Sequence, residues 1–151
     1  MTKKIFIYFL LLTLSHCGFT PIYNSNNDLN YKLNVTTING DGFINNRILN
    51  EIKLISDENS SNELKLKINS KYEKKIVAKN SKGSPTEYEL ITNVEVIIEN
   101  KNKENVKNFI EKQNLKNISD IFEQKNYEND IKTNFAISIV KNLGIELINN
   151  L

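Results

Sequence analysis

The only cysteine and the only histidine of the chain are adjacent, at Cys17 and His16. They follow a start that contains Lys3 and Lys4 and an almost wholly apolar run from Ile5 to Leu14. A short basic stretch followed by about ten apolar residues is typical of a secretory signal peptide, and it is too short to cross about 30 Å of hydrocarbon as a helix. We therefore predict a bacterial export signal over residues 1–16.

The position of Cys17 determines which chemistry its thiol can enter. A lone cysteine in an exported protein cannot form an internal disulfide, so it is intermolecular, free or modified. Leu14 at −3 and Ser15 at −2 match the bacterial lipobox, in which the cysteine receives a diacylglyceryl group and becomes the new N-terminus. His16 at −1 departs from the small residue that the lipoprotein signal peptidase favours. We predict lipidation of Cys17; the alternative is cleavage at another bond, which leaves a free Cys17.

Cleavage before Cys17 also changes the charge and the catalytic residues that remain. The full chain has 20 basic and 18 acidic residues and a formal net charge of +2. Removing Lys3 and Lys4 cancels that excess, so no basic footprint for nucleic acid remains. Removing His16 excludes Ser-His-Asp and Cys-His catalysis and the common zinc sites. We predict a protein that is not an enzyme and has no metal or cofactor; a secreted hydrolase that uses paired acids is the enzymatic alternative.

The chain after the signal divides into a lipidated tether and a single domain. Residues 17–30 are polar and rich in asparagine, which is typical of a connector, and residues 31–151 carry regular apolar patterns. Alternation with a period of two predicts strands, and spacing of three or four predicts helices. The strands are expected over 31–38, 64–78, 88–98 and 106–113, and the helices over 43–55 and 127–147.

Local features are also expected in three of these elements: the first helix, the second strand and the last helix. Asn39 or Asp41 is expected to cap the first helix. The second strand is expected to bend near Ser70, and Gly144 is expected to break or kink the last helix in its final turn.

The order of elements predicts the fold class. Strands joined by short turns become antiparallel neighbours, and amphipathic helices need a sheet face to cover. We predict an α+β two-layer sandwich, in which a four-stranded, mostly antiparallel sheet carries two helices on one face in the order β-α-β-β-β-α. The direction of the first strand beside the others stays open.

The segment that begins at the cysteine resembles the opening of mature LptE-family lipoproteins. These proteins commonly start with Cys-Gly-Phe-x-Pro-Leu-Tyr, and this chain has Cys17-Gly18-Phe19-Thr20-Pro21-Ile22-Tyr23. The stretches Asn46–Glu51 and Tyr127–Ile131 are similar to parts of the first and last helices of that family. The resemblance implies the α+β sandwich already predicted from the pattern of the elements.

The resemblance also implies a role, a partner and a location. Members of the family are non-catalytic plugs inside the large outer-membrane β-barrel LptD. They help this barrel to assemble and to deliver lipopolysaccharide to the outer leaflet. Gly18 is not the aspartate that usually retains a lipoprotein in the inner membrane, so an outer-membrane location is expected. The alternative is an unrelated envelope lipoprotein that binds a small apolar or glycan ligand.

Two groups of side chains are candidates for contacts if this resemblance holds. Lipopolysaccharide carries phosphates, which lysines can pair. One hypothesis is that lysines near the tip of the predicted hairpin contact lipid A phosphates; its alternative is a solvated charged face. A second hypothesis places Phe19 and Tyr23 against the barrel wall or the membrane interface, and its alternative folds them back onto the domain. The lysines of the first hypothesis are Lys74, Lys75, Lys79 and Lys82.

Overall fold

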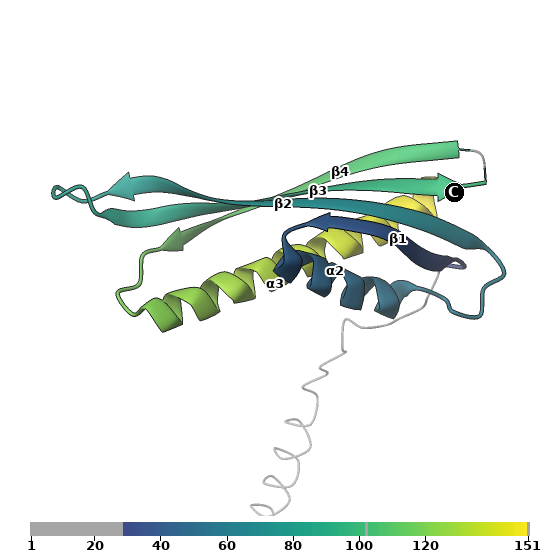
Figure 1. Ribbon diagram of the computed structural model, residues 1–151, viewed down its shortest axis with the longest axis horizontal. Coiled ribbons are helices and arrows are strands. Elements are labelled where there is room, and N and C mark those ends of the chain that lie inside the picture. Colours follow the sequence, from purple (N-terminus) through teal and green to yellow (C-terminus); the bar gives the residue numbers. More distant parts are fainter. Residues whose placement is uncertain (1–28, 102, 151) are drawn as a thin grey trace, which may run out of the picture.

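The computed structural model describes residues 29–101 and 103–150 of the chain. The predicted signal peptide and residues 17–28 of the predicted tether, with Cys17, Phe19 and Tyr23, lie outside the described residues. Leu29, which the pattern placed in the tether, is buried in the core. The described part has the predicted element order (Figure 1). Its elements are β1 (Lys32–Gly40), α2 (Gly42–Ile55), β2 (Glu63–Lys79), β3 (Pro85–Asn100), β4 (Lys103–Lys116) and α3 (Ile121–Asn150).

The four strands form one open sheet in the order β1-β2-β3-β4. β2, β3 and β4 are antiparallel neighbours, whereas β1 runs parallel to β2. The direction that the sequence left open is therefore parallel, with α2 as the crossover that a parallel pair requires. Both helices lie on the same face of the sheet (Figure 1), which confirms the predicted α+β sandwich. No element of the described part covers the opposite face.

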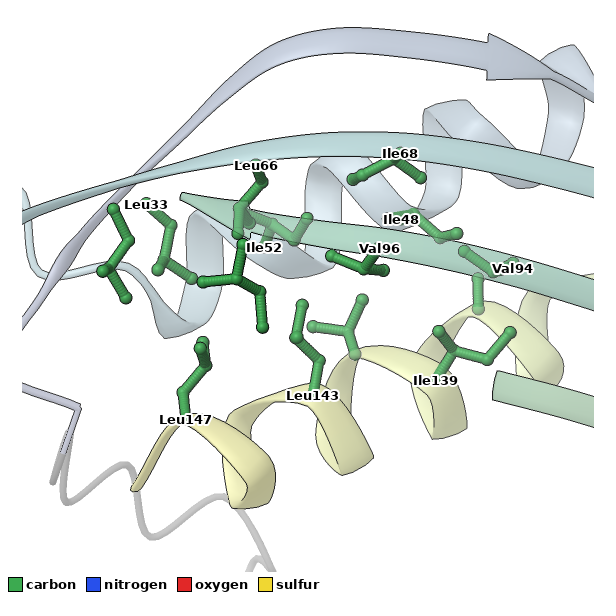
Figure 2. Close-up of a cluster of buried hydrophobic side chains, with 14 of the residues drawn as sticks. Leu33, Ile48, Ile52, Leu66, Ile68, Val94, Val96, Ile139, Leu143 and Leu147 are labelled. Atoms are coloured by element: carbon green, nitrogen blue, oxygen red, sulfur yellow. The ribbon is translucent and has the colours of Figure 1, made fainter. Parts of the chain in front are cut away.

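Aliphatic side chains from both layers form the core. Helix α2 contributes Ile48 and Ile52, and α3 contributes Ile139, Leu143 and Leu147. They pack against the inward side chains of the sheet, which come from alternate positions of its strands (Figure 2). Each such side chain contributes about 1.5–3 kcal/mol on burial. The strand residues labelled in this cluster are Leu33, Leu66, Ile68, Val94 and Val96.

A register shift in β1 explains how its apolar residues share one face. Leu33 and Val35 are two residues apart, but Ile38 follows Val35 by three and would point outward in a regular strand. The register between β1 and β2 shifts between Val35 and Thr37. The extra residue of this bulge turns Ile38 back onto the core.

β2 is one long strand through Ser70, as the apolar pattern on both sides of that residue predicted. β2 pairs with β3 in continuous register through Ser70, and the register shifts come only between Ile76 and Lys79. Ser70 interrupts the apolar pattern because its buried hydroxyl bonds to the start of α2. It donates to Asn45 Oδ1 at 2.6 Å and accepts from the Asp41 backbone N–H at 3.0 Å.

The last helix does not break at Gly144, which was one of the two expected effects of that glycine. Helix α3 continues through Gly144 to Asn150. A glycine inside a helix costs about 1 kcal/mol, and the burial of Leu143 and Leu147 on either side offsets that cost. Tyr127, taken from the pattern as the first residue of the apolar stripe, is 47% exposed. The buried stripe begins instead at Ile131.

Candidate functional site

The start of α2, the middle of β2 and the first half of α3 meet in a cluster of polar side chains. Tyr72 Oη donates a hydrogen bond to Glu128 Oε1 at 2.7 Å, and Lys74 Nζ lies 2.6 Å from Glu128 Oε2. Lys132 Nζ lies 3.4 Å from Asp41 Oδ2 and 3.7 Å from the centroid of the Tyr72 ring. We call these five side chains the β2–α3 network. It ties the sheet to α3 at the edge of the aliphatic core.

Asp41 has a second role in this network. Its Oδ1 accepts the Ile44 backbone N–H at 2.9 Å, so Asp41, one of the two predicted caps, is the N-cap of α2. Its Oδ2 faces Lys132 of α3. One carboxylate therefore fixes both the start of α2 and the position of α3 beside it.

The network fixes the protonation states of Tyr72 and Glu128 at neutral pH. Burial raises the pKa of Tyr72 well above its ordinary value, and the acceptor Glu128 raises it further. Burial alone would raise the pKa of Glu128, but hydrogen bonds from Lys74 and Tyr72 outweigh it and lower the pKa below 4.5. A general acid or base works best with a pKa near the operating pH. A charged Glu128 and a protonated Tyr72 instead form a permanent acceptor and donor.

The four lysines predicted to bind phosphate do not share one surface. Lys74 points to the helix side, where its ammonium group pairs with Glu128 and lies 4.4 Å from the Tyr88 ring centroid. Lys75 points to the uncovered face, because successive strand residues alternate, and pairs with Glu73 at 3.0 Å. The predicted set is therefore divided between opposite faces of β2.

The two other lysines lie at the turn between β2 and β3. Lys79 and Lys82 are exposed, and within the described residues neither makes an ion pair. The turn is held by Asn80, whose Oδ1 accepts the backbone N–H groups of Lys82 and Ser84 at 3.0 and 2.9 Å. These are the members of the predicted set that are available to an outside anion.

The uncovered face of the sheet carries charges that neutralise one another. Lys71 and Lys75 both pair with Glu73, and these contacts lower the pKa of Glu73 to about 2. Farther along, Lys67 pairs with Glu99 of β3. The sequence shows the lysines, but it does not show the strand register that places carboxylates beside them. These ion pairs therefore could not be predicted. The result is a face without a strongly basic patch.

The described part of the chain has a small hollow. It lies where the turn between β3 and β4 approaches the end of α3, and it has a volume of about 220 Å³. Ile98 and Leu147 form its apolar part, and Lys103, Lys107 and Glu146 are among its polar lining residues. Ligand sites usually have volumes of about 300–1,000 Å³. The hollow gives little support to the alternative of a small-ligand carrier.

Metal-binding clusters and membrane-spanning helices are both absent from the described residues. These residues contain no group of three or more His, Cys, Asp or Glu side chains arranged to hold a metal ion. Neither of their helices is both long and apolar enough to cross a membrane.

Comparisons with known proteins identify the fold. No protein-family model matches the chain, and no curated protein matches its sequence. The crystal structure of rare lipoprotein B from Shewanella oneidensis is similar, with a TM-score of 0.54 and 13% identity over 78% of this chain and 89% of that one. The solution NMR structure of an uncharacterized lipoprotein B from Nitrosomonas europaea gives 0.53 and 15%, over 76% and 83%. The chain has the fold of these lipoproteins.

Proposed function

We propose that this chain is a non-catalytic outer-membrane lipoprotein that plugs a large LptD-like β-barrel and helps it to assemble and to deliver lipopolysaccharide. Lipidation at Cys17 would anchor it after removal of residues 1–16. The observation that carries the proposal is the match to rare lipoprotein B, which spans 89% of that chain. Rare lipoprotein B is a name used for the LptE family.

A second line of support comes from the opening motif. The residues from Cys17 to Tyr23 resemble the start of mature LptE proteins and differ from the common pattern only at Ile22. A shared fold at low identity is compatible with many functions. The motif and the fold are independent of each other, because the motif precedes the first described residue, and both indicate the same family.

The surface of the domain is also suited to a barrel interior. The interior of an outer-membrane barrel is polar. The sheet face opposite the helices presents ion pairs such as Lys67–Glu99 and Lys75–Glu73. These charges are already paired with one another, so contact with a polar wall does not require these ion pairs to break.

Co-purification tests the proposal. The full chain with a C-terminal tag, extracted from its own membranes in mild detergent, should bring down an outer-membrane β-barrel of large size. The matched control is the same chain with Cys17→Ala, which should lose the lipid anchor and recover less barrel. A tagged chain that emerges without any barrel would instead favour an envelope lipoprotein of another kind.

A further inference from the structure

The outer edge of β4 is a long strand edge that no described element covers. β4 is the last strand of the sheet, and its other edge pairs with β3 from Lys103 to Lys116. The outer edge therefore offers a row of backbone N–H and C=O groups for another strand. Natural proteins usually protect such an edge with bulges, short strands or charges.

The other exposed edges of this sheet are protected in these ways. β1 is short and has a register shift after Val35. The part of β2 beyond Ser70 has no pairing with β1, but it contains register shifts between Ile76 and Lys79. That part also has lysines and only one acid, so pairing with itself would bring like charges together. Its charged residues are Lys71, Glu73, Lys74, Lys75 and Lys79.

β4 has neither the short length nor the register shifts of those edges, and its charges are of both signs. Its register with β3 is continuous along its whole length. On the uncovered face of the sheet it exposes two aliphatic side chains, Val106 at 50% and Ile110 at 58%. Two of its inward charges already have partners in the same chain, because Lys107 Nζ lies 2.5 Å from Glu146 and Glu111 accepts from Ser138 at 2.6 Å. A strand added to this edge would leave those contacts in place.

The sequence of β4 is complementary to itself in one antiparallel register. When Asn108 faces Asn108 of a second copy, Val106 faces Ile110, and Glu104 faces Lys112. All of these side chains lie on the uncovered face, where strand residues alternate. Apolar pairs and opposite charges directly across two strands are each stabilising by about 0.2–1 kcal/mol. The two-fold symmetry makes each of these unlike pairs occur twice.

The inward side chains, on the face that the helices cover, also bring no like charges together in this register. Lys107 faces Phe109, Asn105 faces Glu111, and Lys103 faces Gln113, so no like charges meet. These pairs follow directly from placing Asn108 on the symmetry axis.

Neighbouring registers that keep the uncovered faces aligned are poorer. Centring the pair on Lys107 places Lys107 against itself and Val106 against Asn108, and centring it on Phe109 places Val106 against Lys112. Centring it on Val106 places Ile110 beyond Lys103, where β4 begins. The register centred on Asn108 is the one that pairs both aliphatic residues and both charges.

We infer that two copies of this chain associate through antiparallel pairing of their β4 strands, with Asn108 on the symmetry axis. The inference goes beyond the proposed function and does not depend on it. Since the two sheets join edge to edge, their uncovered faces continue into one larger face. Self-pairing would also protect the β4 edge while no other strand occupies it.

Cysteine cross-linking tests the register in the full chain with Cys17→Ser, so that each introduced cysteine is the only one. Facing residues of antiparallel strands have Cα atoms about 4.5–5.5 Å apart, which a disulfide can span. Asn108→Cys should form a covalent dimer under mild oxidation. Glu104→Cys alone should not, because positions 104 of the two copies lie roughly 27 Å apart at about 3.4 Å per residue.

Mixing two variants completes the test. Glu104→Cys mixed with Lys112→Cys should give a disulfide-linked pair, although each alone stays monomeric on a denaturing gel. The inference would be overturned if Asn108→Cys failed to cross-link, or if Glu104→Cys cross-linked to itself as readily as Asn108→Cys.

A charge substitution with a matched control tests the association without a cross-link. Asn108→Lys places like charges across the axis and should weaken self-association roughly fivefold. Asn114→Lys is the control, because Asn108 and Asn114 each face a glutamate of β3, Glu95 and Glu89, but Asn114 lies beyond the paired stretch. Equal dissociation constants for the two variants, measured by sedimentation in density-matched detergent, would contradict the register.

Discussion

Glu128 is the residue on which the β2–α3 network depends most. Its two carboxylate oxygens accept from different side chains of β2, Tyr72 and Lys74. Replacing it would leave a half-buried phenol without its acceptor and an ammonium group without its partner. Unpaired polar groups at partly buried positions cost more than the pair itself contributes.

The stability contributed by Glu128 should depend on pH. Glu128→Gln should lower the free energy of unfolding by about 1 kcal/mol at neutral pH, since a partly exposed charged pair is screened by solvent. The folded-state pKa of Glu128 is lowered from 4.5. Its contribution is therefore fully present above pH 4.5 and is lost as the pH falls through that lowered value.

Denaturant titrations between pH 7 and pH 2 measure this dependence. The difference between the wild type and Glu128→Gln should shrink on acidification. Asp130→Asn, at an exposed position of the same helix beyond its first turn, is the control and should remain close to the wild type throughout. A difference for Glu128→Gln that is unchanged at the acidic end would contradict the assigned role.

The lysines show what the sequence could and could not predict at the scale of single residues. Their number near one hairpin is plain in the sequence, and so is the chemistry of phosphate pairing. Their partners are not, because Glu128 is separated from Lys74 by 54 residues. The structure divides the predicted set into the ion-paired Lys74 and Lys75 and the exposed Lys79 and Lys82.

This division makes a prediction for lipopolysaccharide binding. The double variant Lys79→Gln/Lys82→Gln should weaken binding of purified lipopolysaccharide several-fold and leave the fold unchanged, because its side chains have no partner in the described domain. Lys74→Gln/Lys75→Gln removes the same charge from the same hairpin and is the matched control. Its effect on binding should be smaller and its effect on stability larger. Unchanged binding in the first variant, measured by calorimetry, would contradict a phosphate contact at the turn.

At the scale of elements, the junction between β1 and α2 is the most tightly constrained connection. Gly40 has a φ of +105°, and a Cβ atom there would lie 1.7 Å from the Ser70 carbonyl oxygen. Gly42, two residues later at the start of α2, has no atom within 4 Å of an added Cβ. The two glycines thus differ in both conformation and space.

Alanine substitutions should separate these two glycines. Gly40→Ala combines a left-handed backbone with a clash against backbone and should destabilise the domain by at least roughly 3 kcal/mol. Gly42→Ala should be neutral or stabilising by about 0.5–1 kcal/mol, because alanine favours the helix. Thermal unfolding followed by circular dichroism measures both. Similar melting temperatures for the two variants would show that the close approach of Gly40 to Ser70 is not present in solution.

The existence and order of the elements follow from sequence periodicity, but their extent does not. The pattern around Val106 to Gln113 is weak, because polar residues such as Asn108 and Lys112 dominate it. β4 is nevertheless longer than predicted, Lys103–Lys116, since pairing with the strongly patterned β3 supplies hydrogen bonds along its full length. Helix α3 passes through Gly144 for a similar reason, the burial of its neighbours. Tertiary contacts outweigh local propensity at both places.

At the scale of the whole molecule, one face of the sheet carries both helices, and no described element covers the other, bare face (Figure 1). The sequence predicted the two layers from the amphipathic helices. It did not predict the parallel direction of β1, because both directions satisfy the same alternation of Leu33 and Val35. The partner of the bare face cannot be predicted from the sequence either, since polar strand residues such as Lys67 satisfy the requirements of water and of a polar barrel wall equally well.

A plug differs from a protein docked on one side because the barrel surrounds it. A photoreactive amino acid at Asn69, exposed on the bare face of β2, and one at Lys141, exposed on α3, probe opposite sides of the domain. Cross-linking in intact cells, followed by mass spectrometry of the adducts, is the most direct test of the proposed role. We expect both positions to capture the same large outer-membrane β-barrel, and capture of no barrel from either position would contradict the proposal.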